Sequence, residues 1–138
     1  MADVILSRSE LETREAGRAL GAQLPPGSVV LLSGDLGTGK TVFVRGLAQG
    51  LGLDPDEVNS PTFTLIQEYR GERTLHHVDL YRLVPAEVDD LGLEELMAGG
   101  AVVAIEWPDK LPYEMAHAIR VTIDDRGGDE RQIVITCP

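Results

Sequence analysis

The sequence has almost no cysteine and no long apolar run, and both absences narrow the class of protein. The single cysteine, Cys137, can form neither an internal disulfide nor a structural zinc site, which is typical of a reducing compartment. No apolar run approaches the ~20 residues that a membrane-spanning helix requires. Charged side chains interrupt the first 20 residues, so no secretory signal is expected there. We therefore expect a cytoplasmic protein that does not cross a membrane.

Basic residues are also scarce, which limits what the chain can bind directly. Lys and Arg total 12 against 23 Asp and Glu, giving a formal net charge of −11, and the only lysines are Lys40 and Lys110. A domain that binds a nucleic-acid backbone by itself usually presents a basic face. Direct binding of tRNA or DNA is therefore not expected. Residues 85–96 are acidic without a basic side chain, either as a solvent-exposed helical face or as a surface for a basic partner.

The length and the hydrophobic pattern predict the fold. The 138 residues suffice for one domain, which we expect to span residues 1–138. Apolar runs alternate with helical periodicity early in the chain, and hairpin patterns follow. The order predicts an α/β fold, a single P-loop NTPase-like domain with a mixed, centrally parallel sheet flanked by helices. Strands are expected at residues 4–6, 29–32, 64–69, 74–81, 101–105, 119–123 and 132–136, and helices between a capping box at Ser9 and a stop at Pro25, at 40–51, and at 85–97 with a break at Gly92.

A glycine-rich segment carries the strongest functional signal. Residues 34–41 match the pattern G-x-x-x-x-G-K-[ST], and they follow an apolar strand and open a helix. Glycines allow successive backbone amides to turn inward toward phosphate oxygens, and the helix N-terminus adds partial positive charge. In such a loop the Lys40 ammonium would bridge the β- and γ-phosphates and the Thr41 hydroxyl would bind Mg²⁺. The alternative is an ordinary strand–turn–helix with a glycine-rich connection.

Two acids at the ends of apolar runs are candidates for the carboxylate that a magnesium site needs. Glu106 ends the cleaner run and is the better Walker B candidate, while Asp79 ends a less apolar one. One would hold the ion or its waters and the other would orient the attacking water, and the alternative for each is a turn or capping residue. Ser60-Pro61-Thr62 is either a loop that senses phosphate or a plain entry into a strand.

The motifs together resemble one known family. Besides the glycine-rich loop they comprise Ser-Pro-Thr-Phe-Thr-Leu at 60–65, His-Val-Asp-Leu-Tyr-Arg at 77–82, Leu-Gly-Leu-Glu-Glu at 91–95 and Glu-Trp-Pro at 106–108. In this order and spacing, over about residues 30–110, they resemble the bacterial TsaE family, also called YjeE. The resemblance implies an ATPase that binds ATP with Mg²⁺, hydrolyses it slowly alone, and acts with a TsaD–TsaB heterodimer. TsaD transfers a threonylcarbamoyl group to the adenosine beside the anticodon, so tRNA would be contacted only indirectly.

The resemblance also implies roles for individual residues. Thr41 and Glu106 match positions associated with Mg²⁺, and Asp79 matches an active-site acid near the metal and γ-phosphate. Thr62 corresponds to a switch-like loop, and Trp107 lies beside the nucleotide. Further nucleotide contacts fall at Glu10, near the base, at Arg131, and along the loop at Asp35, Leu36, Gly37, Thr38, Gly39, Lys40 and Thr41. Val42 departs from the family, which commonly has a second hydroxyl residue at this position. The missing hydroxyl removes about 1 kcal/mol of hydrogen bonding.

Three other functions share the loop but fit the sequence less well. A small kinase needs an acceptor pocket with an arginine-bearing lid, and residues 85–97 contain no arginine. A GTPase needs an Asn-Lys-x-Asp segment, which the sequence lacks. A non-catalytic module would not need its Lys40, Thr41, Asp79 and Glu106 intact. We interpret His77 as structural, because His76 beside it points to the opposite face of a strand and the pair is a poor metal site.

Overall fold

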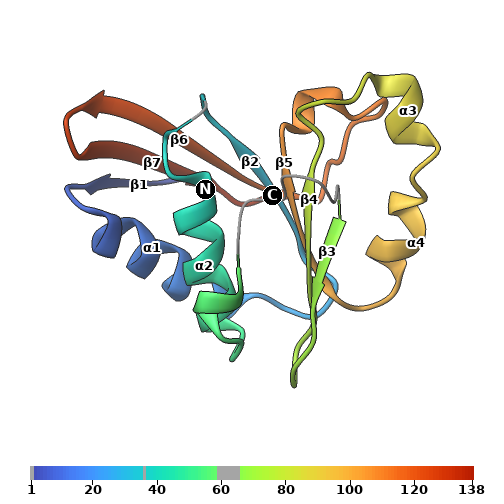
Figure 1. Ribbon diagram of the computed structural model, residues 1–138, viewed down its shortest axis with the longest axis horizontal. Coiled ribbons are helices and arrows are strands. Elements are labelled where there is room, and N and C mark those ends of the chain that lie inside the picture. Colours follow the sequence, from blue (N-terminus) through green and yellow to red (C-terminus); the bar gives the residue numbers. More distant parts are fainter. Residues whose placement is uncertain (1, 36, 59–65) are drawn as a thin grey trace.

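The computed structural model describes residues 2–35, 37–58 and 66–138, which form one twisted sheet with helices on both faces (Figure 1). The sheet has seven strands in the order β1-β7-β6-β2-β5-β4-β3. The strands are β1 (Ala2–Ser7), β2 (Val29–Ser33), β3 (Ile66–Tyr69), β4 (Leu75–Asp79), β5 (Val102–Glu106), β6 (Ile119–Gly127) and β7 (Glu130–Thr136). The helices are α1 (Glu10–Gln23), α2 (Lys40–Gly50), α3 (Pro85–Asp89) and α4 (Leu93–Ala98), with short 3-10 turns η1 (Pro55–Glu57) and η2 (Pro108–Lys110).

The centre of the sheet is parallel and its two flanks are antiparallel. Strand β2 runs parallel to both β5 and β6, and β4 runs parallel to β5. The flanking strands β1, β7 and β3 pair in antiparallel fashion. The predicted mixed, centrally parallel α/β fold is therefore confirmed. Because β2, β5 and β4 end at the same edge, the segments that follow them meet there, where ligands collect in open α/β sheets.

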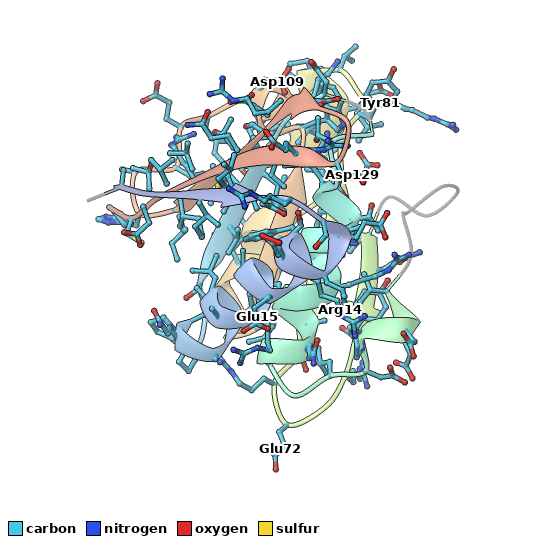
Figure 2. The ribbon with its side chains drawn as sticks, turned by 90° about the vertical axis from the view of Figure 1, so that its left-hand side faces the viewer. Arg14, Glu15, Glu72, Tyr81, Asp109 and Asp129 are labelled. Carbon is cyan, nitrogen blue, oxygen red and sulfur yellow. The ribbon has the colours of Figure 1, made fainter. Side chains whose placement is uncertain are left out.

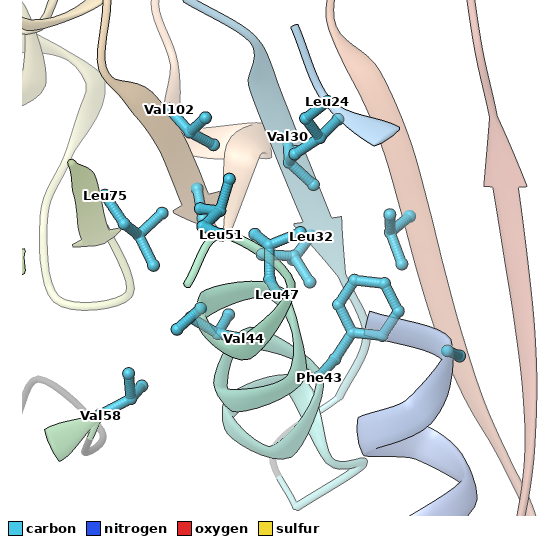
Figure 3. Close-up of a cluster of buried hydrophobic side chains, with 14 of the residues drawn as sticks. Leu24, Val30, Leu32, Phe43, Val44, Leu47, Leu51, Val58, Leu75 and Val102 are labelled. Carbon is cyan, nitrogen blue, oxygen red and sulfur yellow. The ribbon is translucent and has the colours of Figure 1, made fainter. Parts of the chain in front are cut away.

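Both faces of the central strands are buried, which explains their continuous apolar runs. Helices α1 and α2 cover one face, and α3 and α4 lie on the other (Figure 1). Side chains of α2, including Phe43 and Leu47, pack against Leu32 on β2 (Figure 3). The neighbouring Leu31 points to the opposite face and joins the second cluster, with Val88 of α3. The alternation of a strand thus divides one apolar run between two cores.

Helices α1 and α2 approach each other closely at four glycines. Gly17 and Gly21 on α1 face the backbone of α2, and Gly46 and Gly50 on α2 face that of α1. A Cβ added at Gly46 would lie 1.9 Å from the Arg14 carbonyl oxygen, and one at Gly17 would lie 2.2 Å from the Phe43 carbonyl oxygen. Such distances leave room only for hydrogen atoms, so the two backbones are in direct contact. This contact fixes the start of α1 beside the start of α2.

Most predicted elements are confirmed, with differences at their ends. Ser9 caps α1 by accepting from the Glu12 amide, but the Glu12 carboxylate accepts from the Arg8 amide instead of that of Ser9. Gly92 separates α3 from α4 with a φ of 72°. The strands expected at 119–123 and 132–136 are longer in the structure: β6 continues to Gly127 and β7 begins at Glu130, because their backbone pairing persists through polar residues. No described helix is long and apolar enough to cross a membrane.

Candidate functional site

The glycine-rich loop leaves the carboxyl end of β2 and turns directly into α2. Gly34, Gly37 and Gly39 have φ values of 152°, 80° and 104°, a region that L side chains rarely adopt. Gly34 also has no space for a side chain, since a Cβ would lie 2.6 Å from the Ile123 carbonyl oxygen. The Thr38 hydroxyl donates to the Asp35 carbonyl oxygen at 2.9 Å and tightens the turn. Leu36 lies outside the described residues.

The first turn of α2 has no side-chain cap among the described residues. Its N-cap is Gly39, which has no side chain to accept from the first amides of the helix. Lys40 and Thr41 are the first two helical residues. The uncapped N–H groups and the helix dipole together favour an anion at this position. The sequence pattern and the local backbone therefore both favour an anionic ligand.

Lys40 is almost fully buried, at 5% exposure, and the close contacts of its ammonium within the described part of the chain are with uncharged groups. Nζ donates to the Gly34 carbonyl oxygen at 2.7 Å and lies 3.9 Å from the ring centroid of Trp107. Burial lowers the pKa of the Lys40 ammonium, while the nearby carboxylates of Glu106 and Asp79 act in the opposite direction. A buried cation held by a carbonyl and an aromatic ring gains much from an anionic ligand.

The two predicted acids are neighbours. Asp79 ends β4 and Glu106 ends β5, and the two residues are paired in the parallel register of these strands. Oδ1 of Asp79 accepts a hydrogen bond from the Tyr81 amide at 2.9 Å. Burial raises the pKa of the Asp79 carboxyl; the Tyr81 amide opposes this shift and the Glu106 carboxylate adds to it. Glu106 is 4% exposed, and its Oε2 lies 2.5 Å from Nε2 of His77.

Trp107 has an unusual backbone that turns its ring toward the loop. Its φ and ψ are 61° and 55°, the left-handed conformation, and it is the only described residue other than glycine with a positive φ. Such a backbone costs of order 1–2 kcal/mol for an L residue, so its surroundings must hold it. The Trp107 amide donates to the Leu32 carbonyl oxygen at 3.3 Å. The indole also packs against the Tyr81 ring, with centroids 4.9 Å apart and ring planes tilted by 44°.

One cavity of about 280 Å³ brings most of the predicted site residues together. Its lining comprises Glu10, Gly37, Gly39, Lys40, Thr41, Val42, Asp79, Glu106 and Trp107. A second cavity of about 90 Å³ shares four of these residues and adds Arg131 on β7. Nε of Arg131 donates to the Thr38 carbonyl oxygen at 3.0 Å, so the last strand supports the loop. The nucleotide contacts assigned to these residues stay predictions, and Thr62 lies outside the described residues.

A larger cavity lies elsewhere and contains none of the predicted site residues. It measures about 580 Å³ and is lined by Arg70, Glu72, Arg73 and His76, among others. Figure 2 shows Glu72 at the end of the molecule opposite Tyr81 and Asp109, which follow the carboxyl ends of β4 and β5. Volume alone would therefore favour a different region of the molecule. The smaller cavity combines an uncapped helix start, a buried cation and two acids, which makes it the better candidate site.

The donor set at this edge suits Mg²⁺ better than a metal held by protein alone. The described residues contain no group of three or more His, Cys, Asp or Glu side chains able to hold a metal. Mg²⁺ commonly takes one or two carboxylates and keeps waters or substrate phosphate oxygens as its other ligands. The Thr41 hydroxyl and the Glu106 and Asp79 carboxylates on the cavity wall fit that requirement.

Sequence reasoning missed two contacts at this site. It interpreted His77 as structural and did not foresee its contact with the carboxylate of Glu106. The shared face of residues 77 and 79 was a partial signal, but the contact also needs the register of β4 with β5. The contact between the Tyr81 and Trp107 rings had no signal in the sequence, because it depends on the left-handed backbone of Trp107.

Together the fold and the site define a class: mixed α/β proteins with a Walker A glycine-rich loop facing paired acids at the carboxyl edge of a centrally parallel sheet. A family model described as "Threonylcarbamoyl adenosine biosynthesis protein TsaE" matches residues 7–133. The chain belongs to the TsaE family. The resemblance noted in the sequence motifs is thereby confirmed.

Individual relatives agree with this assignment. Proteins named "tRNA threonylcarbamoyladenosine biosynthesis protein TsaE" from Nostoc sp. and Treponema pallidum are 44% and 40% identical to this chain. The alignments cover 96% and 94% of this chain and 85% and 97% of those proteins. Among solved structures, the crystal structure of YdiB from Bacillus subtilis matches with a TM-score of 0.79 and 34% identity, over 99% of this chain and 86% of that one. The fold is therefore shared along nearly the whole chain.

Proposed function

We propose that the protein binds ATP with Mg²⁺ at the loop of residues 34–41 and hydrolyses it slowly as the ATPase subunit of threonylcarbamoyladenosine synthesis on tRNA. The observation that carries the proposal is the single cavity in which Lys40 and Thr41 face Asp79 and Glu106. The family supports the biological setting, since its relatives are named for tRNA threonylcarbamoyladenosine biosynthesis.

Lys40 supplies the positive charge for the phosphates. Its ammonium is already desolvated, so an incoming phosphate oxygen would replace the Gly34 carbonyl oxygen as acceptor without further loss of hydration. The amides at the start of α2 would donate to the same phosphates. Because the loop is held by Arg131 and by the turn through Thr38, little reorganisation is needed on binding.

The other residues of the site have separate roles in this proposal. Thr41 and Glu106 would hold Mg²⁺ or its waters, and the ion, when bound, neutralises charge on the phosphates. Asp79 would orient the attacking water and accept its proton, a role that fits a carboxyl whose pKa burial raises. Trp107 would lie against the bound nucleotide, because its ring already contacts Lys40. Glu10 lines both cavities, so the start of α1 would close the site on the side away from β5.

The partners in this proposal are a TsaD–TsaB heterodimer, with tRNA bound by that complex. The net charge of −11 supports the indirect role, since an acidic chain attracts phosphate backbones poorly. The test is to measure ATP hydrolysis and threonylcarbamoyl transfer to tRNA with the chain alone, with the heterodimer alone, and with both. Transfer over repeated cycles is expected only when both are present with ATP. Equal multiple-turnover transfer without this chain would contradict the proposal.

A further inference from the structure

We propose that His77 is a positioning residue that orients the Glu106 carboxylate for the metal side of the site; this inference rests on the proposed nucleotide function. His77 does not line the cavity. It acts through a single contact, in which its Nε2 lies 2.5 Å from Oε2 of Glu106. The two residues are 29 positions apart in the sequence, and the sheet alone brings them together.

The parallel register of β4 and β5 creates this contact. Asp79 is paired with Glu106, and His77 is paired with Ala104, one step back along the same face. The His77 ring therefore extends along the sheet toward the carboxylate at the end of the next strand. A histidine at position 76 or 78 would point to the opposite face and could not reach it. The spacing His-x-Asp thus places an orienting group and an acid side by side against Glu106.

Burial makes the His77–Glu106 contact stronger than the same contact would be at the protein surface. His77 is fully buried and Glu106 nearly so. A carboxylate removed from water needs hydrogen bonds to remain charged, and a charge-assisted donor in a dry environment is among the stronger ones. No described residue other than His77 donates a hydrogen bond to the Glu106 side chain. The direction of this carboxylate therefore depends on His77.

The surroundings of the ring select one tautomer. Nδ1 of His77 is buried and has no hydrogen-bond partner among the described residues. If Nδ1 carried a proton, a buried N–H would be left unpaired, whereas a bare nitrogen lone pair costs less. With the proton on Nε2, the ring donates to Glu106 and avoids the unpaired donor. The geometry therefore favours the tautomer with its proton on Nε2.

This arrangement commits one carboxylate oxygen of Glu106 and leaves the other for the metal side. Oε2 accepts from His77, and no hydrogen bond of the described residues reaches Oε1. Groups that hold metal-side carboxylates in place typically change metal affinity or activity by about 10- to 100-fold when mutated. Loss of the His77 donor should therefore act on the use of Mg²⁺ more than on the nucleotide itself.

The chain offers a matched set of variants. In His77→Gln the side-chain nitrogen is as many bonds from Cβ as Nε2 of histidine, so the donor to Glu106 is kept. His77→Asn carries the same amide one carbon shorter and does not reach. His76→Gln is the control, because His76 is also buried and lies near a carboxylate, 3.7 Å from Glu68, but belongs to the other face.

The experiment compares these variants in ATP affinity without Mg²⁺ and in the Mg²⁺ concentration that gives half-maximal hydrolysis with the partner complex. We expect His77→Asn to raise that Mg²⁺ concentration about 10- to 100-fold. His77→Gln and His76→Gln should stay within about threefold of the parent, and ATP affinity without Mg²⁺ should be unchanged in all three. If His77→Asn matches His77→Gln, the positioning role is wrong. If the parent itself binds no ATP, the proposed function is wrong instead.

A second measurement needs no variant and covers the case in which His77→Asn does not fold. Nitrogen-15 NMR of the parent protein distinguishes a protonated from a bare ring nitrogen. We expect His77 to show a protonated Nε2 and an unprotonated Nδ1 at neutral pH. A protonated Nδ1 with a bare Nε2 would overturn the proposal, because such a ring donates nothing to Glu106.

Discussion

The ammonium of Lys40 lies 3.9 Å above the ring of Trp107, and it also donates to the Gly34 carbonyl oxygen. The chain thus satisfies the one buried lysine of the glycine-rich loop with its own uncharged groups. An anion that enters the cavity competes with a carbonyl oxygen and a π face, not with a carboxylate in direct contact. Lys40 can therefore bind an anionic ligand without first breaking a direct ion pair.

Replacing Lys40 by alanine should reduce ATP affinity by about 10- to 100-fold, the range for a lost charged hydrogen bond. The fold should remain intact, because the variant removes a buried charge that gains little in the free protein. Isothermal titration and a thermal melt measure the two quantities. Lys110→Ala is the control, since Lys110 is the only other lysine and does not line the cavity. Unchanged affinity in a folded Lys40→Ala variant would remove the loop from the proposed site.

Glu106→Gln should lower hydrolysis about 100-fold while ATP binding changes little. A group that acts mainly in the transition state affects kcat far more than ground-state affinity. The assay must contain the partner complex, because slow basal turnover would hide the difference. Glu57→Gln, on the exposed turn η1, is the control with the same chemical change. Turnover at the parental rate would place Glu106 outside the chemistry.

Asp79→Asn should abolish much of the activity but make the fold more stable at neutral pH. Burial raises the pKa of Asp79 in the folded state, so the folded protein loses stability as pH rises through that pKa. The asparagine side chain keeps the acceptor for the Tyr81 amide and has no charge to bury. Denaturant unfolding should give the variant a higher free energy of unfolding than the parent at pH 7. This difference should disappear below the ordinary aspartate pKa of about 3.9.

The control for this measurement is Asp3→Asn, the same chemical change at an exposed carboxylate that does not line the cavity. If the Asp79→Asn variant is less stable than the parent at pH 7, the carboxylate contributes favourably to the fold. Its burial would then be no sign of a group held ready for catalysis.

The fluorescence of Trp107 should report nucleotide binding. It is the only tryptophan, and its ring contacts Lys40 in the cavity wall. When phosphates draw Lys40 away from the ring, the charge next to the indole changes, so the intensity or emission maximum should shift. Titration with ATP and Mg²⁺ measures the response, and Lys40→Ala should remove it. A flat signal at calorimetric saturation would mean that the indole does not sense the ligand.

Gly46→Ala should destabilise the fold by about 1–3 kcal/mol, the usual range for overpacking. Its new Cβ would lie 1.9 Å from the Arg14 carbonyl oxygen, so α1 and α2 would have to separate. Gly99→Ala is the matched control, because Gly99 has a helical backbone and its added Cβ would lie 3.4 Å from the Leu96 carbonyl oxygen. Chemical denaturation of both variants compares them, and equal stability would show that the helices tolerate a wider spacing.

The sequence predicts the fold and the loop because both depend on local patterns. Apolar runs mark the strands, and the spacing of Gly34, Gly39 and Lys40 defines the loop. The contacts between distant segments are not encoded locally. The His77–Glu106 pair needs the register of β4 with β5, and the Lys40–Trp107 contact needs a left-handed tryptophan. The repeated glycines at 17, 21, 46 and 50 carried a signal for close helix contact that the sequence analysis did not use.

Because β7 is the last strand of the chain, the contacts that depend on it can form only at the end of translation. β1 pairs only with β7 among the described strands, and the Thr38 carbonyl oxygen receives its bond from Arg131 of the same strand. A nascent chain that has emerged from the ribosome as far as Glu106 already holds the glycine-rich loop and both acids. Its first strand is still unpaired, and its loop lacks the Arg131 support. A ligand should therefore stabilise the growing chain fully only after β7 has emerged from the ribosome.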